Sequence, residues 1–357
     1  MKATLYVHHD AALLGNKIFS DEPINGMKRD TYLYAALCKV LSQRGIELAT
    51  QDIHPPQESD LIICLDQPMQ FQHFVRTRPG QKLHLILTEP ATYYPENWLV
   101  ENHAPFDRIL TYDPTRVDNT RYFQYHYAID FKDFPRYKRP SEEEFAARKL
   151  CVLMAAAFGV VKPPKGSGSL LYERYQTLKW FSEHHPEEFD LFSRGISPKT
   201  YVSFRGAGFL SKVLPTYALQ LVSKRRERVF ARVNRGSVPP NQKIEILQHY
   251  RFPISYENTG DTPGYLTEKL FDALAAACVP IYLGHADASR LVPAECFINR
   301  SDFRSHEELY QFLKGMGYEE YARYLDASEA FLKSPAMQLL STEYNAHLMA
   351  GVLTQPH

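Results

Sequence analysis

A carboxylate and an ammonium stand side by side at the start of a predicted helix in the C-terminal half of the chain. Glu268 and Lys269 follow the polar loop 257–264 and open an apolar-periodic segment over 265–278. The helix dipole disfavours a cation there by roughly 0.3–1 kcal/mol, whereas free backbone N–H groups at this end attract anions. A bound phosphate would reverse that cost. The pattern therefore favours a site for a phosphorylated ligand, with Glu268 accepting hydrogen bonds from ribose or sugar hydroxyls.

Leucines at helical spacing predict that one side of this helix is buried. The opposite side should face the ligand, and it carries Tyr265, Glu268, Lys269 and Asp272. Tyr265 could stack on the ligand or donate a hydrogen bond. A second interpretation stays open, in which Glu268 and Lys269 only pair with neighbouring charges on a solvated surface.

A glutamate after an apolar run in the N-terminal half is the second candidate. Residues 83–88 predict a strand that ends at Glu89 and Pro90, and ligands of open α/β sheets bind beyond the carboxyl ends of the strands. Pro90 stops the ladder and keeps Glu89 extended. A carboxylate at this edge could act as a general base that takes a proton from a bound hydroxyl group. The alternative is an exposed loop acid without a catalytic role.

Three further side chains are candidates for contact with an acceptor. Tyr93 and Tyr94 follow Glu89 and could stack on a sugar face, although such rings are also ordinary core residues. His8 follows the first predicted strand and faces the same edge by the same rule, unless it is only part of a turn.

The helix and its flanks resemble the donor-binding signature of the α1,3/4-fucosyltransferases, glycosyltransferase family 10. That signature is an aromatic-Glu-Asn run, a short loop, Tyr-x-Thr-Glu-Lys, then Val/Ile-Pro and a Gly. The chain carries it at Tyr256-Glu257-Asn258, Tyr265-Leu266-Thr267-Glu268-Lys269 and Val279-Pro280-Ile281-Tyr282-Leu283-Gly284. Weaker likeness extends to segments 170–174, 189–195, 235–243 and, in the acceptor half, 88–113.

The resemblance implies a metal-independent, inverting transferase of the GT-B type that uses GDP-fucose. It implies that Glu89 is the general base and that Lys269 and an arginine stabilise the leaving diphosphate. The donor-binding residues it implies are Arg235, Asn258, Tyr265, Glu268 and Lys269. Departures from the family pattern at Ser193, Tyr256 and His285 leave the donor sugar open.

Short apolar runs alternate with amphipathic segments along the whole chain, which predicts an α/β fold with parallel sheets. The proline-containing, charged stretch 131–148 interrupts the pattern, which then restarts. We expect two Rossmann-like domains facing across a cleft: an acceptor-binding domain over 1–140 and a donor-binding domain over 149–335. A helical tail should follow over 336–357.

Composition excludes several classes. The formal net charge of the 357 residues is zero, which disfavours a nucleic-acid partner. The basic run 224–235 could bind a diphosphate or an anionic membrane, or be a solvated helix face. The absence of an Asp-x-Asp pair and of His/Cys clusters predicts no metal cofactor. Five cysteines without CxxC spacing, and an N-terminus unlike a signal peptide, predict a cytoplasmic protein, peripheral to the inner membrane if 224–235 contacts it.

The sequence thus predicts transfer of fucose to a hydroxyl of an acceptor glycan, such as GlcNAc or Glc of a bacterial surface polysaccharide or a Lewis-type glycan. Three alternatives remain: a GT-B transferase using another GDP- or dTDP-sugar, a catalytically inactive nucleotide-sugar-binding protein, and a peripheral membrane-binding module. Retention of Glu89 favours an active enzyme over an inactive one.

Overall fold

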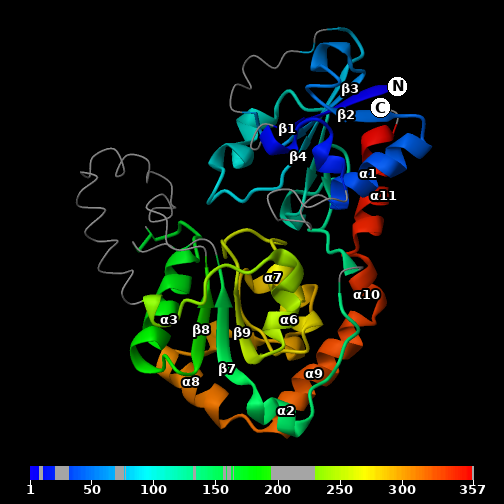
Figure 1. The fold of residues 1–357 in the computed structure, drawn as a ribbon. Helices are drawn as coiled ribbons and strands as arrows, with labels where there is room; N and C mark the ends of the chain where they lie inside the picture. Colours follow the sequence, from blue (N-terminus) through cyan, green and yellow to red (C-terminus); the bar gives the residue numbers. More distant parts are fainter. Residues whose placement is uncertain are drawn as a thin grey trace. The chain divides into compact units, whose positions relative to one another are not determined.

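The computed structural model describes residues 1–7, 11–20, 32–68, 76, 78–131, 134–155, 158, 162, 163, 165–193 and 230–355 (Figure 1). Two predicted features, His8 and the part of the basic run over 224–229, lie outside these residues. The chain divides into two compact units. The first comprises Met1–Lys132 and Pro335–His357, and the second comprises Asp133–Ser334.

The first unit is built on a six-stranded parallel sheet in the order β2-β1-β3-β4-β5-β6. Its strands are β1 (Lys2–Val7), β2 (Glu47–Thr50), β3 (Leu61–Leu65), β4 (Lys82–Ile86), β5 (Arg108–Thr111) and β6 (Tyr122–Gln124). Every residue of β3 is buried, as expected for a strand covered on both faces. The parallel strands predicted here are confirmed, and β2 is an additional strand too short to stand out in the sequence.

Helix α1 (Tyr32–Gln43) lies beside α11 (Thr342–Thr354), the C-terminal helix, in this unit (Figure 1). Arg44 donates a hydrogen bond to Thr354 at 3.0 Å, and the short helix α10 (Pro335–Gln338) precedes α11. The segment treated as a separate tail in the sequence therefore belongs to the first unit, because the buried side of α11 packs there. Short 3-10 helices connect the strands, over Ala11–Leu13, Lys17–Phe19, Pro56–Glu58, Pro95–Trp98, Val100–His103 and Pro114–Arg116.

The second unit is built on a five-stranded parallel sheet in the order β11-β10-β9-β7-β8. Its strands are β7 (Lys149–Met154), β8 (Phe189–Phe192), β9 (Tyr250–Tyr256), β10 (Ile281–Leu283) and β11 (Ile298–Asn299). One face packs against α3 (Leu171–His184), α8 (His306–Gly315) and α9 (Tyr318–Leu332). The other packs against α6 (Lys243–Leu247) and α7 (Glu268–Ala275), and α2 (Glu142–Ala147) precedes β7 (Figure 1).

In both sheets the strand order reverses at the first strand, because the second and third strands lie on opposite sides of it. This reversal identifies where a ligand would bind. In the second unit β7 lies between β8 and β9, so the connections leave it on both sides. Crevices outside the carboxyl ends of strands at such switch points are the usual ligand sites of open α/β sheets. Glu257 and Asn258 follow β9 directly. Asp66 follows β3 at the corresponding point of the first sheet.

None of the helices in the described part of the chain is both long and apolar enough to cross a membrane.

Candidate active site

Helix α7 begins three residues later than the apolar periodicity predicts. It spans Glu268–Ala275, so Glu268 and Lys269 are its first two residues. The preceding turn needs a glycine, because Gly264 has a φ of 73°. The N–H of Gly264 points to a carboxylate oxygen of Asp287 at 3.2 Å. The turn and the first residues of α7 therefore have a defined geometry after β9.

A buried glutamate anchors the start of this helix. Glu257 is 0 % exposed. Its Oε1 accepts the backbone N–H of Thr267 at 2.8 Å, and its Oε2 accepts the Thr267 hydroxyl at 2.7 Å. Burial raises the pKa of Glu257, while the nearby Lys269 opposes this shift. The sequence analysis assigned no role to Glu257, although its position directly after a buried strand at the switch point was a usable signal.

The Lys269 ammonium lies against this anchor. Its Nζ donates to the Thr267 hydroxyl at 2.8 Å and lies 3.4 Å from Glu257 Oε2 and 3.5 Å from Glu268 Oε1. The side chain remains 21 % exposed. The interpretation that Glu268 and Lys269 pair with neighbouring charges thus describes these contacts, and the binding of an anion by Lys269 stays a prediction.

The ion pairs continue along α7 through a second lysine. Lys243 of α6 lies 2.7 Å from Asp272 Oδ2 and 4.0 Å from Glu268 Oε1. Burial opposes ionisation of Glu268, but Lys269 and Lys243 outweigh it and lower its pKa to about 2. Asp272 is 1 % exposed. The prediction that Asp272 faces a ligand is therefore wrong, because α6 covers that turn of the helix and supplies a cation to it.

A buried arginine fixes the loop that follows β9. Arg174 of α3 donates to the carbonyl oxygens of Tyr256 and Glu257 at 2.7 and 3.2 Å, and to Asn258 Oδ1 at 3.0 Å. The Asn258 amide in turn lies 3.4 Å from the Tyr265 hydroxyl. Tyr265 is only 6 % exposed, and its contact with a ligand stays a prediction. The structure thus brings Asn258, Tyr265, Glu268 and Lys269 to one edge of the sheet.

Arg235 belongs to a different group of ion pairs. Its Nε donates to Asp190 Oδ1 at 2.7 Å, and Asp190 also accepts from Lys149 at 2.9 Å and from the Tyr250 hydroxyl at 2.7 Å. Burial opposes ionisation of Asp190, but these three hydrogen bonds lower its pKa. The Arg235 side chain is 48 % exposed. A role for it in binding a diphosphate stays a prediction.

Glu89 lies in the first unit, after β4, with an exposed side chain. Its backbone is held firmly: the N–H donates to Asp66 Oδ1 at 3.1 Å, and the carbonyl accepts from Trp98 Nε1 at 2.9 Å. Asp66 is buried and also accepts from the N–H of Thr88 at 2.7 Å and from Asn97 at 2.5 Å. The sequence analysis missed Asp66, which marks the carboxyl end of β3.

The two tyrosines after Glu89 differ in their surroundings. Tyr93 is 40 % exposed. Tyr94 is partly buried and its hydroxyl donates to the carbonyl of Gln67. Burial, followed by the charges of Glu96 and Asp66, raises the pKa of Tyr94 to about 12. Of the two, Tyr93 offers the more accessible ring to an acceptor, and neither role is tested by these contacts.

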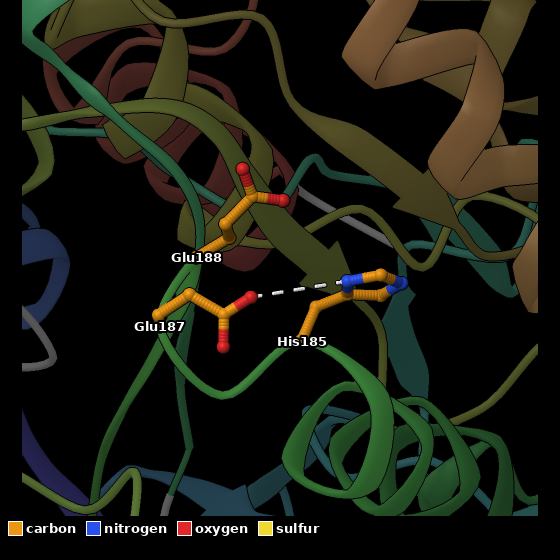
Figure 2. A group of neighbouring side chains, drawn as sticks. All are labelled: His185, Glu187 and Glu188. Atoms are coloured by element: carbon orange, nitrogen blue, oxygen red, sulfur yellow. Dashed lines mark ion pairs between the residues drawn. The ribbon is translucent and has the colours of Figure 1, made fainter.

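One group of side chains in the described residues has the composition of a metal site (Figure 2). His185, Glu187 and Glu188 follow α3, and the His185 ring lies 4.0 Å from Glu187. Glu188 already accepts the Tyr310 hydroxyl at 2.7 Å and pairs with the Lys314 ammonium. A cation here would have to displace that ammonium, so the group is satisfied by the protein itself.

Comparison with known proteins places the C-terminal half in a family. The family model described as glycosyltransferase family 10 (fucosyltransferase) C-term matches residues 216–345. Homo sapiens alpha-(1,3)-fucosyltransferase 7 is 37% identical over 108 residues, which cover 29% of this chain and 31% of that protein. An Arabidopsis thaliana alpha-(1,4)-fucosyltransferase is 40% identical over 80 residues, covering 21% of this chain and 20% of that protein. Each match thus spans less than a third of the relative's length.

Solved structures resemble the chain over its whole length. The crystal structure of an alpha1,3-fucosyltransferase has a TM-score of 0.53 at 16% identity, covering 100% of this chain and 90% of that one. An alpha-glucosyltransferase in complex with UDP-glucose and DNA containing an abasic site has a TM-score of 0.55 at 9% identity, covering 99% and 100%. At such identities the likeness concerns the fold, and it confirms the predicted GT-B type with two Rossmann-like domains.

The residues matched by the family model include the whole motif over 256–284, with strand β9 and helix α7. The resemblance inferred from the sequence is therefore confirmed for residues 216–345, which match the C-terminal part of the glycosyltransferase family 10 (fucosyltransferase) model.

Proposed function

We propose that the chain transfers L-fucose from GDP-fucose to a hydroxyl group of an acceptor glycan, with inversion at the anomeric carbon. The single observation that supports this most is the position of Lys269, whose side chain is 21 % exposed, at the amino end of α7 and at the same edge of the second sheet as Asn258 and Tyr265. Amino ends of helices and cations both favour a diphosphate. The curated relatives named above are fucosyltransferases, which supports fucose as the sugar.

The proposed reaction assigns one role to each group. The acceptor oxygen attacks the anomeric carbon of the donor while the bond from that carbon to the β-phosphate oxygen breaks. Glu89 takes the proton of the acceptor hydroxyl, a form of catalysis typically worth 10²–10⁴-fold. Lys269, with Arg235 as the candidate arginine, stabilises the charge that develops on the departing GDP. Glu268 and Tyr265 would hold the ribose or sugar hydroxyls.

The second substrate of the proposed reaction is the acceptor glycan. We propose a GlcNAc or Glc residue of a bacterial surface polysaccharide or a Lewis-type glycan, bound near Glu89 with the exposed ring of Tyr93 against a sugar face. His8 is a further candidate in the same region. We also propose that no metal is required, since the sequence has no Asp-x-Asp pair and basic residues can offset the diphosphate charge. A cytoplasmic location stays a prediction.

The test is turnover of a panel of sugar nucleotides, followed by release of free nucleoside diphosphate, for the wild type and for Glu89→Gln. We expect release of GDP from GDP-fucose in the presence of acceptor glycans, and a loss of at least about 10²-fold in the variant. Turnover of a different GDP- or dTDP-sugar would support the alternative donor. No turnover of any donor, with GDP still bound, would instead support an inactive nucleotide-sugar-binding protein.

A further inference from the structure

We propose that Glu257, acting through Thr267, is a positioning residue that sets where the Lys269 ammonium meets the diphosphate of the donor. This inference rests on the proposed function, because it takes Lys269 as the group that contacts the diphosphate. It adds two residues to that site which do not themselves touch the donor.

Three hydrogen bonds join the end of β9 to the start of α7. Thr267 donates its N–H and its hydroxyl to the two carboxylate oxygens of Glu257, at 2.8 and 2.7 Å. The Ser255 hydroxyl donates to the carbonyl oxygen of Lys269 at 2.9 Å. Glu257 is 0 % exposed, and its own N–H donates to the Leu283 carbonyl at 2.8 Å. These contacts hold Glu257 on the sheet, so the hydrogen bonds to Thr267 attach the start of α7 to the sheet.

The direction of the hydrogen bonds explains how Glu257 can influence the position of the Lys269 ammonium through Thr267. The Lys269 ammonium can only donate hydrogen bonds, so the single hydroxyl proton of Thr267 points away from it, to Glu257 Oε2. The lone pairs of that hydroxyl are then free to accept from Lys269, whose Nζ lies 2.8 Å away. This is the shortest contact of the ammonium, since its distances to Glu257 and Glu268 are 3.4 and 3.5 Å. Thr267 thus determines the position of Nζ, and Glu257 determines the orientation of Thr267.

A second possibility is that Glu257 only neutralises the charge of Lys269. This possibility predicts the opposite effect on anion binding when the Glu257 charge is removed. Glu257 and Glu268 both face the ammonium, whereas the other nearby lysine, Lys243, is engaged by Asp272 and Glu268. Removing the Glu257 charge would then make the site less negative and would strengthen the binding of an anion. Positioning predicts weaker binding after the same change, so the sign of the effect separates the two roles.

The test uses a matched pair at Thr267 and an isosteric change at Glu257, with GDP as the probe. Thr267→Val keeps the shape but removes the hydroxyl, whereas Thr267→Ser keeps the hydroxyl. We expect Thr267→Val to raise the Kd of GDP about tenfold, as for the loss of one hydrogen bond to a charged group, and Thr267→Ser to stay within about twofold. Glu257→Gln should weaken binding in the same direction as Thr267→Val. Calorimetry gives the Kd, and thermal melting shows that each variant is folded.

The outcomes separate this inference from the proposed function. Wild-type protein that binds no GDP and turns over no donor contradicts both. Wild-type protein that binds GDP, with Thr267→Val and Thr267→Ser equal in affinity, overturns the positioning role alone. Tighter GDP binding by Glu257→Gln also overturns it, in favour of a simple countercharge. A rise in Kd for Thr267→Val that Thr267→Ser does not share supports it.

Discussion

The carboxyl ends of the two sheets hold their candidate residues in opposite ways. After β9, the side chains are held: Lys269, Thr267 and Glu257 form a hydrogen-bonded chain, and the lysine keeps only 21 % exposure. After β4, hydrogen bonds hold the backbone at Glu89. Asp66 and Trp98 bind the N–H and the carbonyl of Glu89, whose side chain is exposed.

This difference matches the two kinds of chemistry that we propose. A group that binds a fixed diphosphate gains from a side chain already in place, because the ligand then meets no reorganisation cost. A general base must reach an acceptor hydroxyl and exchange its proton with solvent. Its carboxylate therefore has to stay accessible, while the backbone of the residue can be held in place. The difference is in keeping with the proposal that the second unit binds the donor and that Glu89 of the first unit takes the proton.

The largest expected effect is on the affinity for GDP, which should depend on Lys269 but not on Glu89. Lys269→Ala is expected to raise the Kd of GDP roughly 10- to 100-fold, because charge-assisted hydrogen bonds contribute about 1.5–3 kcal/mol. Glu89→Gln should leave that Kd within about twofold, since the carboxylate acts on the acceptor. Calorimetric titration with GDP checks both. A similar loss of affinity in the two variants would contradict the division of labour.

A smaller effect is expected where the backbone of Glu89 is held. Asp66→Asn replaces the charged acceptor of the Thr88 and Glu89 N–H groups with a weaker, neutral one, which should loosen the strand end and lower kcat about tenfold, since small misplacements of catalytic groups are costly. The Kd of GDP should not change. Asp113→Asn is the control, because that carboxylate caps the 114–116 helix of the same unit. Equal loss of kcat in both variants would refute a specific role for Asp66.

The smallest effect concerns stability, at the ion pairs of Asp190 with Lys149 and Arg235. Because its partners lower the pKa of Asp190, the ionised form stabilises the folded state. That stabilisation is complete above the ordinary aspartate pKa of about 4 and is lost as the pH falls from there through the lower folded pKa.

Asp190→Asn should accordingly lower the free energy of unfolding by roughly 1–3 kcal/mol at neutral pH, and the difference from wild type should shrink below about pH 4. Denaturant unfolding at several pH values measures it. Glu183→Gln, which removes an exposed pair with Lys179, should change stability by less than about 0.5 kcal/mol. A difference for Asp190→Asn that does not depend on pH would show that the charge is not the cause.

Much of the fold was predictable because buried parallel strands are continuous apolar runs. The run predicted as a strand over 83–88 became β4 (Lys82–Ile86), with a change of one or two residues in its bounds. β2 and β11 were not predicted, since strands of four and two residues carry too little periodicity. The site motif was predictable because its residues are close in sequence, and the family comparison confirms the resemblance that it carries.

The sequence by itself determined the parallel α/β architecture, the family resemblance of residues 216–345, and the amino-end position of Glu268 and Lys269, because each depends on residues within one or two neighbouring segments. Only the tertiary structure decided which charges pair. Asp272 is buried by Lys243 from another helix, Arg174 reaches the 256–258 loop from α3, and Arg235 turns to Asp190. These contacts join residues far apart in the chain, and side-chain packing between elements, which local periodicity does not encode, selects among the possible partners.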